Sequence, residues 1–368
     1  MLFAMPRLTL VTIVLGVHWL GAATGVGASF GAATSSSPQG KGGGNRNVAS
    51  PVSWESTVNI GRGAWGRMAR LTNSWWLLVH TVFPSAEPSR LRVLQSTNEG
   101  RAWTRLAEVV EPGQKFDNGN LLILPSGEVL LTGRSLIDGE SYRLPVYRST
   151  NGGRDWARWS NIDTNEGTPG TLKGRGLWEP HLAWLAHGRV TVVYASEKHS
   201  GYSQIVAQKV SPDGGATWGA EIRAVAQPGG GKLRPGMPVL TRMANGQFLL
   251  VYEVVGLGRG EVHCKTSRDG VTWTEGLGAH IPAHEAGPFA FAAEDGRVFV
   301  TSCANVISVS EDFGGSWRLL EPPPFPMGFK YSWPALYQTR AGEIGAIIST
   351  GSVKLRFGKL EAGPNANR

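Results

Sequence analysis

The chain has 368 residues, of which 36 are Lys or Arg and 28 are Asp or Glu, so its formal net charge is +8 at pH 7. This basic balance suits a polyanionic neighbour such as pectin or another anionic glycan, and it equally suits a well-solvated surface of a secreted protein. No Lys/Arg run is interleaved with aromatic residues, so we expect no nucleic-acid partner.

Residues 1–28 have the pattern of a secretory signal peptide. Arg7 lies in a short n-region, an apolar run extends from Leu8 to Leu20, and small residues follow up to Ala28. A transmembrane anchor is the alternative reading, but the apolar stretch is short for a bilayer and His18 interrupts it. We therefore predict a cleaved signal, a secreted protein, and no membrane contact after cleavage.

Residues 29–50 are rich in Gly and Ser and too poor in apolar side chains to fold, so we expect a disordered linker there. Residues 51–368 remain, a length that would allow two domains. Two cysteines, Cys264 and Cys303, are compatible with export and with either one disulfide or two thiols.

An eight-residue pattern recurs five times in this remaining region. Each copy combines a Ser, an Asp or Asn two residues later, a Gly and a closing Trp, and the fourth copy is one residue shorter; the copies begin at Ser96, Ser149, Ser211, Ser267 and Ser310. In a tight turn the Asp or Asn accepts hydrogen bonds from backbone amides one or two residues later, and Gly supplies the positive φ. Successive copies are 43 to 62 residues apart, which is typical of one small antiparallel sheet per repeat.

The copies resemble the Asp-boxes of the sialidase superfamily. The resemblance implies an all-β chain that folds into a six-bladed, sialidase-like β-propeller over residues 51–368, with five Asp-box turns, and the repeats therefore favour one domain over two. In blade three we expect strands at 181–185, 189–195 and 204–210. Blade six has no box, and residues near 51–60 should complete its sheet and close the ring.

A central pocket can be located from this tracing. Because strands within a blade are antiparallel, the start of strand one, the end of strand two and the start of strand three share one face, and the boxes lie on the other. The residues at those positions are Arg67, His80, Asp117, Asn118, Arg134, Glu179, Glu197, Arg234, Glu253, His284, Glu285, Cys303, Tyr331, Ser332 and Trp333.

Two of these residues, Glu179 and Glu253, form a candidate catalytic pair. Glu179 opens blade three, and Glu253 closes the second strand of blade four after an apolar run. Glycoside hydrolysis needs two carboxyl groups, about 5 to 5.5 Å apart in retaining enzymes. Apolar surroundings should favour the neutral form of Glu253, as a general acid requires. The alternative is that either Glu pairs with Arg234 or Arg67, but two carboxyl groups facing one pocket favour catalysis.

A narrower resemblance concerns the segments 176–182 and 234–240 together with Gly246 and 251–253. They are similar to the exo-1,5-α-L-arabinanases of glycoside hydrolase family 93. The resemblance implies a retaining enzyme that releases arabinobiose from the end of linear arabinan, with Glu179 as nucleophile and Glu253 as acid/base. The candidate substrate-binding residues are then Arg67, Asn118, Trp178, Arg234, Tyr331 and Trp333, where the two Trp residues are stacking platforms or ordinary propeller packing.

Two further functions stay open. In an exo-α-sialidase Arg67 would be the first arginine of the carboxylate-binding triad and Tyr331 the nucleophile. However, no Asp follows the second strand of blade one at 80–83, and a sialic-acid carboxylate needs clustered arginines. The third possibility is a non-catalytic glycan-binding propeller.

Neither a metal nor another cofactor is expected. The His residues are scattered, no Cys/His spacing matches a zinc site, and the boxes lack the alternating ligands of calcium loops. We expect a monomer whose partner is a polysaccharide or glycan substrate.

Overall fold

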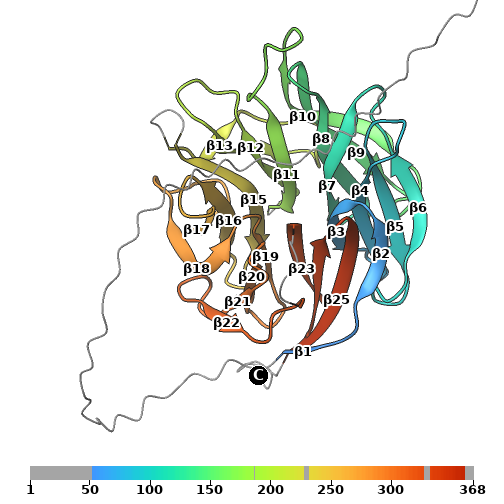
Figure 1. Ribbon diagram of the computed structural model, residues 1–368, viewed down its shortest axis with the longest axis vertical. Helices are drawn as coiled ribbons and strands as arrows, with labels where there is room; N and C mark the ends of the chain where they lie inside the picture. The colour runs from blue at the N-terminus through green and yellow to red at the C-terminus, as the bar shows by residue number, and fades with distance from the viewer. Residues whose placement is uncertain (1–51, 186, 228–231, 327–331, 361–368) are drawn as a thin grey trace, which may run out of the picture. The chain divides into compact units, whose positions relative to one another are not determined.

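The computed structural model describes residues 52–185, 187–227, 232–326 and 332–360. Within these ranges every helix or strand is a β-strand, and the strands form six antiparallel sheets that follow one another as the blades of a propeller (Figure 1). The predicted all-β fold with six blades is therefore confirmed. The predicted signal peptide and linker lie outside the described residues.

Five blades each contain four strands, numbered in chain order. Blade one consists of β3 (Ala64–Arg70), β4 (Trp76–Val82), β5 (Arg90–Ser96) and β6 (Thr104–Val109). Blade two consists of β7 (Lys115–Ile123), β8 (Val129–Ile137), β9 (Ser141–Ser149) and β10 (Ala157–Glu166). Blade three consists of β11 (Leu177–Trp184), β12 (Val190–Ser196), β13 (Ile205–Ser211) and β14 (Ile222–Val225). Blade four consists of β15 (Arg234–Arg242), β16 (Phe248–Val255), β17 (Glu261–Ser267) and β18 (Ala279–Glu285). Blade five consists of β19 (Phe289–Ala292), β20 (Val298–Thr301), β21 (Ile307–Ser310) and β22 (Arg318–Leu320).

Blade six joins the two ends of the described chain. Its strands β23 (Ser332–Arg340), β24 (Glu343–Ser349) and β25 (Ser352–Leu360) are extended by β1 (Val52–Trp54) and β2 (Val58–Arg62), which both pair with β25 (Figure 1). The predicted ring closure by residues near 51–60 is therefore confirmed. The pairing of β1 and β2 with β25 covers what would otherwise be an open edge of blade six.

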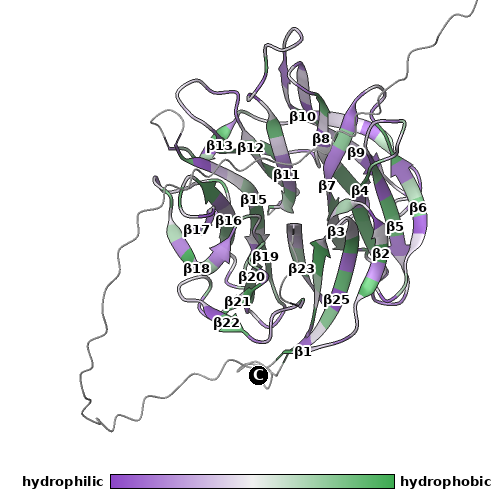
Figure 2. Cartoon of the chain, viewed as in Figure 1, coloured by the Kyte–Doolittle hydropathy of each residue, from purple (hydrophilic) through white to green (hydrophobic). Residues whose placement is uncertain are grey.

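The second strands of the blades form the most buried part of the core. All seven residues of β4, β12 and β24 are buried, because each blade is packed between two neighbours and both of its faces are covered. Figure 2 shows the apolar residues along the strands of the blades. The tight packing fixes each blade against the next and so fixes the strand ends that form the site.

The five boxes are turns between the third and fourth strands of their blades. In the box that follows β13, Ser211 Oγ accepts a hydrogen bond from the Gly215 amide at 2.7 Å and donates to Asp213 Oδ1 at 2.8 Å. The Asp213 carboxylate in turn accepts the Thr217 amide at 2.8 Å. We expected the Asp side chain to bind amides one or two residues later. In this box the turn instead brings the amide four residues later against the carboxylate, so the expectation was too short.

The first strand of blade three begins earlier than expected, at Leu177 rather than at residue 181. A register shift between Trp178 and His181 interrupts its pairing with β12, and pairing resumes at His181, directly after Pro180. Proline removes one ladder hydrogen bond and is tolerated at such a bulge. The bulge places Glu179 within the strand and not before it.

Candidate active site

The inner strands of the blades are irregular near their start, on the face opposite the boxes. Register shifts interrupt β3, β7, β11, β15 and β23. Each shift contains a residue with positive φ, followed by Gly or Pro; these residues are Trp65, Asn118, Glu179, Met237 and Trp333. In blade five Gly287, with φ of 50°, precedes Pro288 just before β19. Left-handed backbone costs about 1 to 3 kcal/mol per residue and is concentrated at functional sites.

The two candidate catalytic carboxyl groups each reach the start of the inner strand of the next blade. Glu179 Oε2 accepts a hydrogen bond from the Met237 amide of blade four at 3.3 Å. In the same manner Glu253 Oε2 accepts the Gly287 amide of blade five at 2.6 Å. Positive-φ residues at the inner strands of adjacent blades therefore hold adjacent carboxyl groups by the same kind of contact.

Both carboxyl groups have raised pKa values. Burial, and next the negative charge of Glu253, raise the pKa of Glu179 from its ordinary value of 4.5 to about 7. Burial also raises the pKa of Glu253, against the opposing effects of the Gly287 amide and the Arg234 charge. The effect of the Glu253 charge on Glu179 indicates that the two groups lie near each other, because like charges shift a titration mainly at short range.

Two arginines near this pair are already bound to carboxylates. Arg134 forms a two-pronged ion pair with Asp117 at 2.7 and 2.6 Å, and its positive charge opposes part of the rise in the pKa of Glu179. Arg234 pairs with Glu197 at 2.5 Å and also donates to Gln204 at 3.0 Å. Among the residues that the structure describes, neither Glu179 nor Glu253 has an ion pair with an arginine, so the alternative pairings with Arg234 and Arg67 are not formed.

Arg67 lies deeper, at 3% exposure. Its Nη1 donates to the backbone oxygens of Gly66 and Trp333 at 2.9 and 3.1 Å. Its guanidinium lies 4.4 Å from the Trp65 ring and 5.3 Å from the Phe289 ring, distances typical of cation–π contacts. Burial lowers the pKa of Arg67 to about 10, so it remains charged at neutral pH.

Aromatic and imidazole side chains surround Arg67. His181 contacts the Phe289 ring edge-on at 6.0 Å, and burial lowers the pKa of His181 to about 3, so the imidazole is neutral. The Tyr337 hydroxyl accepts the Met68 amide at 3.0 Å, and burial raises its pKa to about 12. The layer around Arg67 therefore carries one charge, that of the guanidinium.

The remaining candidate substrate-binding residues differ in accessibility. Trp333 is exposed at 38% and tilts against Trp65 at 5.9 Å. Trp178 is half-buried, and its ring lies between Tyr142 at 5.7 Å and the Arg134 guanidinium at 4.3 Å. Asn118 is half-buried in the bulge of β7, and Tyr331 lies outside the described residues. Trp333 is thus the more open of the two candidate platforms.

Several residues that complete the site were not predicted from the sequence. Met237 and Gly287 contribute amides, and Trp65, His181 and Tyr337 surround Arg67. A Gly or Pro near the start of each inner strand, directly after the residue with positive φ, was the available signal, since this pair recurs in all six blades. His284 was expected at the pocket face, but it is buried, and its two ring nitrogens form hydrogen bonds with the Ser302 and Ser308 hydroxyls.

Cys264 and Cys303 are free thiols, the first buried and the second half-buried. Within the described ranges, no group of three or more His, Cys, Asp or Glu side chains could hold a metal ion. The same ranges contain no helix long and apolar enough to cross a membrane.

The sheets and box turns define a six-bladed β-propeller of the sialidase-like, Asp-box class. More particularly, the chain belongs to the BNR repeat-like domain family, whose sequence pattern matches residues 45–275. No curated protein matches the chain by sequence.

Solved structures with this fold include two that contain arabinobiose. The family 93 α-L-arabinofuranosidase of Fusarium graminearum has a TM-score of 0.73 at 17% identity, and the α-L-arabinanase of Penicillium chrysogenum has a TM-score of 0.71 at 20% identity. Each alignment covers 83% of this chain and 98% of the other. The NanB sialidase of Streptococcus pneumoniae has a TM-score of 0.58 at 11% identity over 83% of this chain and 68% of its own. These neighbours are glycoside hydrolases that share the fold.

Proposed function

We propose that the protein is a retaining, exo-acting glycoside hydrolase that releases arabinobiose from α-1,5-linked L-arabinan. The effect of the Glu253 charge on the pKa of Glu179 is the observation that carries this proposal, since retaining hydrolysis requires two nearby carboxyl groups in different protonation states. The arabinobiose complexes of the two fungal neighbours support the choice of substrate.

In the proposed reaction Glu179, as carboxylate, attacks the anomeric carbon while the glycosidic bond to the leaving oxygen breaks. Glu253, as carboxylic acid, gives its proton to that oxygen. The Glu253 carboxylate then takes a proton from water, whose oxygen displaces Glu179 from the anomeric carbon, and both groups return to their starting states. The resemblance to family 93 assigns the two roles.

Repulsion between the two groups supports such a division of labour. Because the ionised form of either carboxyl disfavours ionisation of the other, the pair retains one proton over a range of pH, and its titration belongs to the pair. The Met237 and Gly287 amides are positioning groups, since each holds one carboxyl oxygen and stabilises its ionised form.

The arginines argue against a sialidase. Of Arg67, Arg134 and Arg234, two already bind the carboxylates of Asp117 and Glu197. Only Arg67 lacks a carboxylate partner among the described residues. A sialic-acid carboxylate would thus meet one available guanidinium instead of a cluster.

The test is hydrolysis of linear α-1,5-arabinan and, in parallel, of a fluorogenic sialoside. The variants are Glu179→Ala, Glu253→Ala with and without azide, and Glu275→Ala, which removes an exposed carboxyl as a control. We expect arabinobiose from the wild type and the control, loss in both site variants, and a glycosyl azide from Glu253→Ala. Cleavage of the sialoside alone, or of neither substrate, would refute the proposal.

We also propose that the protein is secreted as a monomer. The signal-peptide pattern of residues 1–28 supports export. The mass and the N-terminal sequence of protein collected from culture medium test this. A secreted chain that retains residues 1–28, or a dimer in sedimentation, contradicts the corresponding part.

A further inference from the structure

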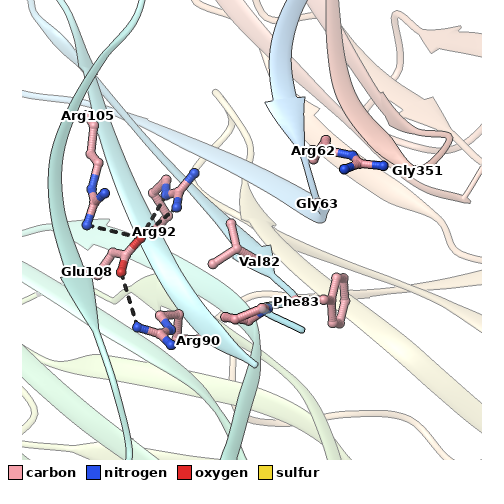
Figure 3. Close-up of a pocket in the computed structure, with 10 residues that line it drawn as sticks. Arg62, Gly63, Val82, Phe83, Arg90, Arg92, Arg105, Glu108 and Gly351 are labelled. Carbon is pink, nitrogen blue, oxygen red and sulfur yellow. Dashed lines mark hydrogen bonds and ion pairs between the residues drawn. The ribbon is translucent and has the colours of Figure 1, made fainter. Parts of the chain in front are cut away.

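A cavity of about 630 Å³ lies on the face of the active site, over blade one. Its walls come from the end of β4, both outer strands β5 and β6, the end of β2, and Gly351 of blade six. Figure 3 shows Arg62 and Gly351 on one side of this cavity and Arg90, Arg92 and Arg105 on the other. None of these arginines belongs to the site described above.

The cavity walls have an excess of positive charge. The four arginines face a single acidic lining residue, Glu108. Glu108 accepts hydrogen bonds from Arg92 at 2.9 and 2.7 Å and forms ion pairs with Arg105 at 3.2 Å and Arg90 at 3.5 Å. Three guanidinium groups therefore share the Glu108 carboxylate (Figure 3), and Arg90 is also paired with Glu87 just outside the cavity lining.

Arg62 adds a charge that no acidic side chain balances. It is exposed, and its side chain has no hydrogen bond or ion pair to any residue that the structure describes. By comparison, a cavity of about 420 Å³ between blades four and five is lined by one cation, Lys265, and one carboxylate, Asp312. The excess of positive charge in the cavity at blade one is thus a local feature and not a property of every cavity in this basic protein.

This arginine cavity continues toward the proposed catalytic pocket. A second cavity of about 550 Å³ is lined by Trp333 and Ser332 and shares Gly63, Phe83 and Gly351 with the first. Phe83 is 64% exposed between the two, and an exposed aromatic ring can stack on the apolar face of a sugar. A glycan with one end at Trp333 can therefore extend past Phe83 to the arginines.

We propose that the arginine cavity is a subsite for an acidic sugar unit, carrying a carboxylate or a sulfate ester, of the glycan whose end the proposed hydrolase cleaves. The inference rests on that proposed function for its link to catalysis. Guanidinium groups bind both anions through paired N–H donors, and linear arabinan is neutral and leaves these donors unused. The natural substrate is then an arabinan-like chain that bears acidic sugars.

Calorimetric titration with three probes tests the subsite without any need for hydrolysis. They are trigalacturonate, its fully methyl-esterified counterpart, and a sulfated chondroitin disaccharide. The variant Arg62→Gln/Arg105→Gln removes the two most exposed arginines of the cavity. Arg70→Gln is the matched control, because Arg70 is exposed at the end of β3 that lies away from the cavity. Equal thermal unfolding temperatures verify that the variants are folded.

We expect the wild type to bind trigalacturonate or the sulfated disaccharide at least ~10-fold more tightly than the neutral ester, with affinity falling as salt rises. The double variant should lose about 10-fold in affinity for the acidic probe, and Arg70→Gln should lose none. Tighter binding of one acidic probe identifies the anion as carboxylate or sulfate. Equal binding of acidic and neutral probes, no binding at all, or an unaffected double variant overturns the subsite.

The two proposals fail separately. If trigalacturonate binds as expected but arabinan and its acidic derivatives are not hydrolysed, the proposed hydrolase is wrong and the anion site stands. If arabinan is hydrolysed and the acidic probes do not bind, the subsite is wrong and the hydrolase stands.

Discussion

The raised pKa of Glu179 predicts a dependence of stability on pH that can be measured without a substrate. The perturbation is Glu179→Gln, which keeps the shape of the side chain and removes its titration. In the folded protein the pKa of Glu179 is about 7, above its ordinary value of 4.5. Below 4.5 both folded and unfolded chains hold the proton, so the wild type has its full stability there.

As pH rises from 4.5 to about 7, the unfolded chain releases this proton before the folded chain does, and the wild type loses stability relative to the variant. A tenfold change in an ionisation constant corresponds to about 1.4 kcal/mol. The full rise in pKa therefore corresponds to a relative loss of about 3 kcal/mol, complete above pH 7. Burial contributes the larger share and the charge of Glu253 the next.

The assay is urea unfolding of the wild type and Glu179→Gln across this pH range, repeated in a Glu253→Gln background. We expect the free-energy difference between Glu and Gln at position 179 to grow with pH in both backgrounds, but less when Glu253 is neutral. A difference that is constant with pH would refute the burial argument. An equal pH dependence in both backgrounds would show that the two carboxyl groups do not interact.

Three other predictions concern the box face, the glycine before β19 and a thiol. Ser211→Ala should reduce the free energy of unfolding by about 1 to 3 kcal/mol, because the buried Gly215 amide loses its acceptor. Arabinan turnover at saturating substrate should stay unchanged. A loss of turnover in fully folded protein would contradict the structural role of the boxes. Gly287→Ala should lower turnover about 10-fold or more, because a Cβ at this position, where φ is 50°, would lie 2.8 Å from Cys303 Sγ and would displace the amide that holds Glu253. Adding Cys303→Ala should restore part of the lost turnover. Full activity of Gly287→Ala alone would disprove the positioning role. Burial raises the pKa of the Cys303 thiol to about 11, so iodoacetamide at neutral pH should modify it far more slowly than in the urea-unfolded chain; equal rates, followed by mass spectrometry, would contradict this.

The repeats allowed the architecture to be predicted, because a box is a local device. Ser, Asp or Asn, Gly and Trp within eight residues contain the donors and acceptors that close the turn, as the contacts of Ser211 and Asp213 show. The spacing of the boxes then implied one sheet per repeat, and the missing sixth box pointed to closure by the strands near residues 51–60. The reach of the Asp side chain and the bulge at Glu179 could not be obtained in this way.

The sequence alone determined the strands, their order and the face on which polar side chains gather, because these depend on alternation and turn chemistry along a continuous segment. Only the tertiary structure decided the partners across blades. Glu253 meets the Gly287 amide, Arg234 meets Glu197, and Arg62 lies across a cavity from Arg105. These contacts depend on the bulges and on how closely neighbouring sheets pack once the ring is closed, and no local propensity encodes that packing.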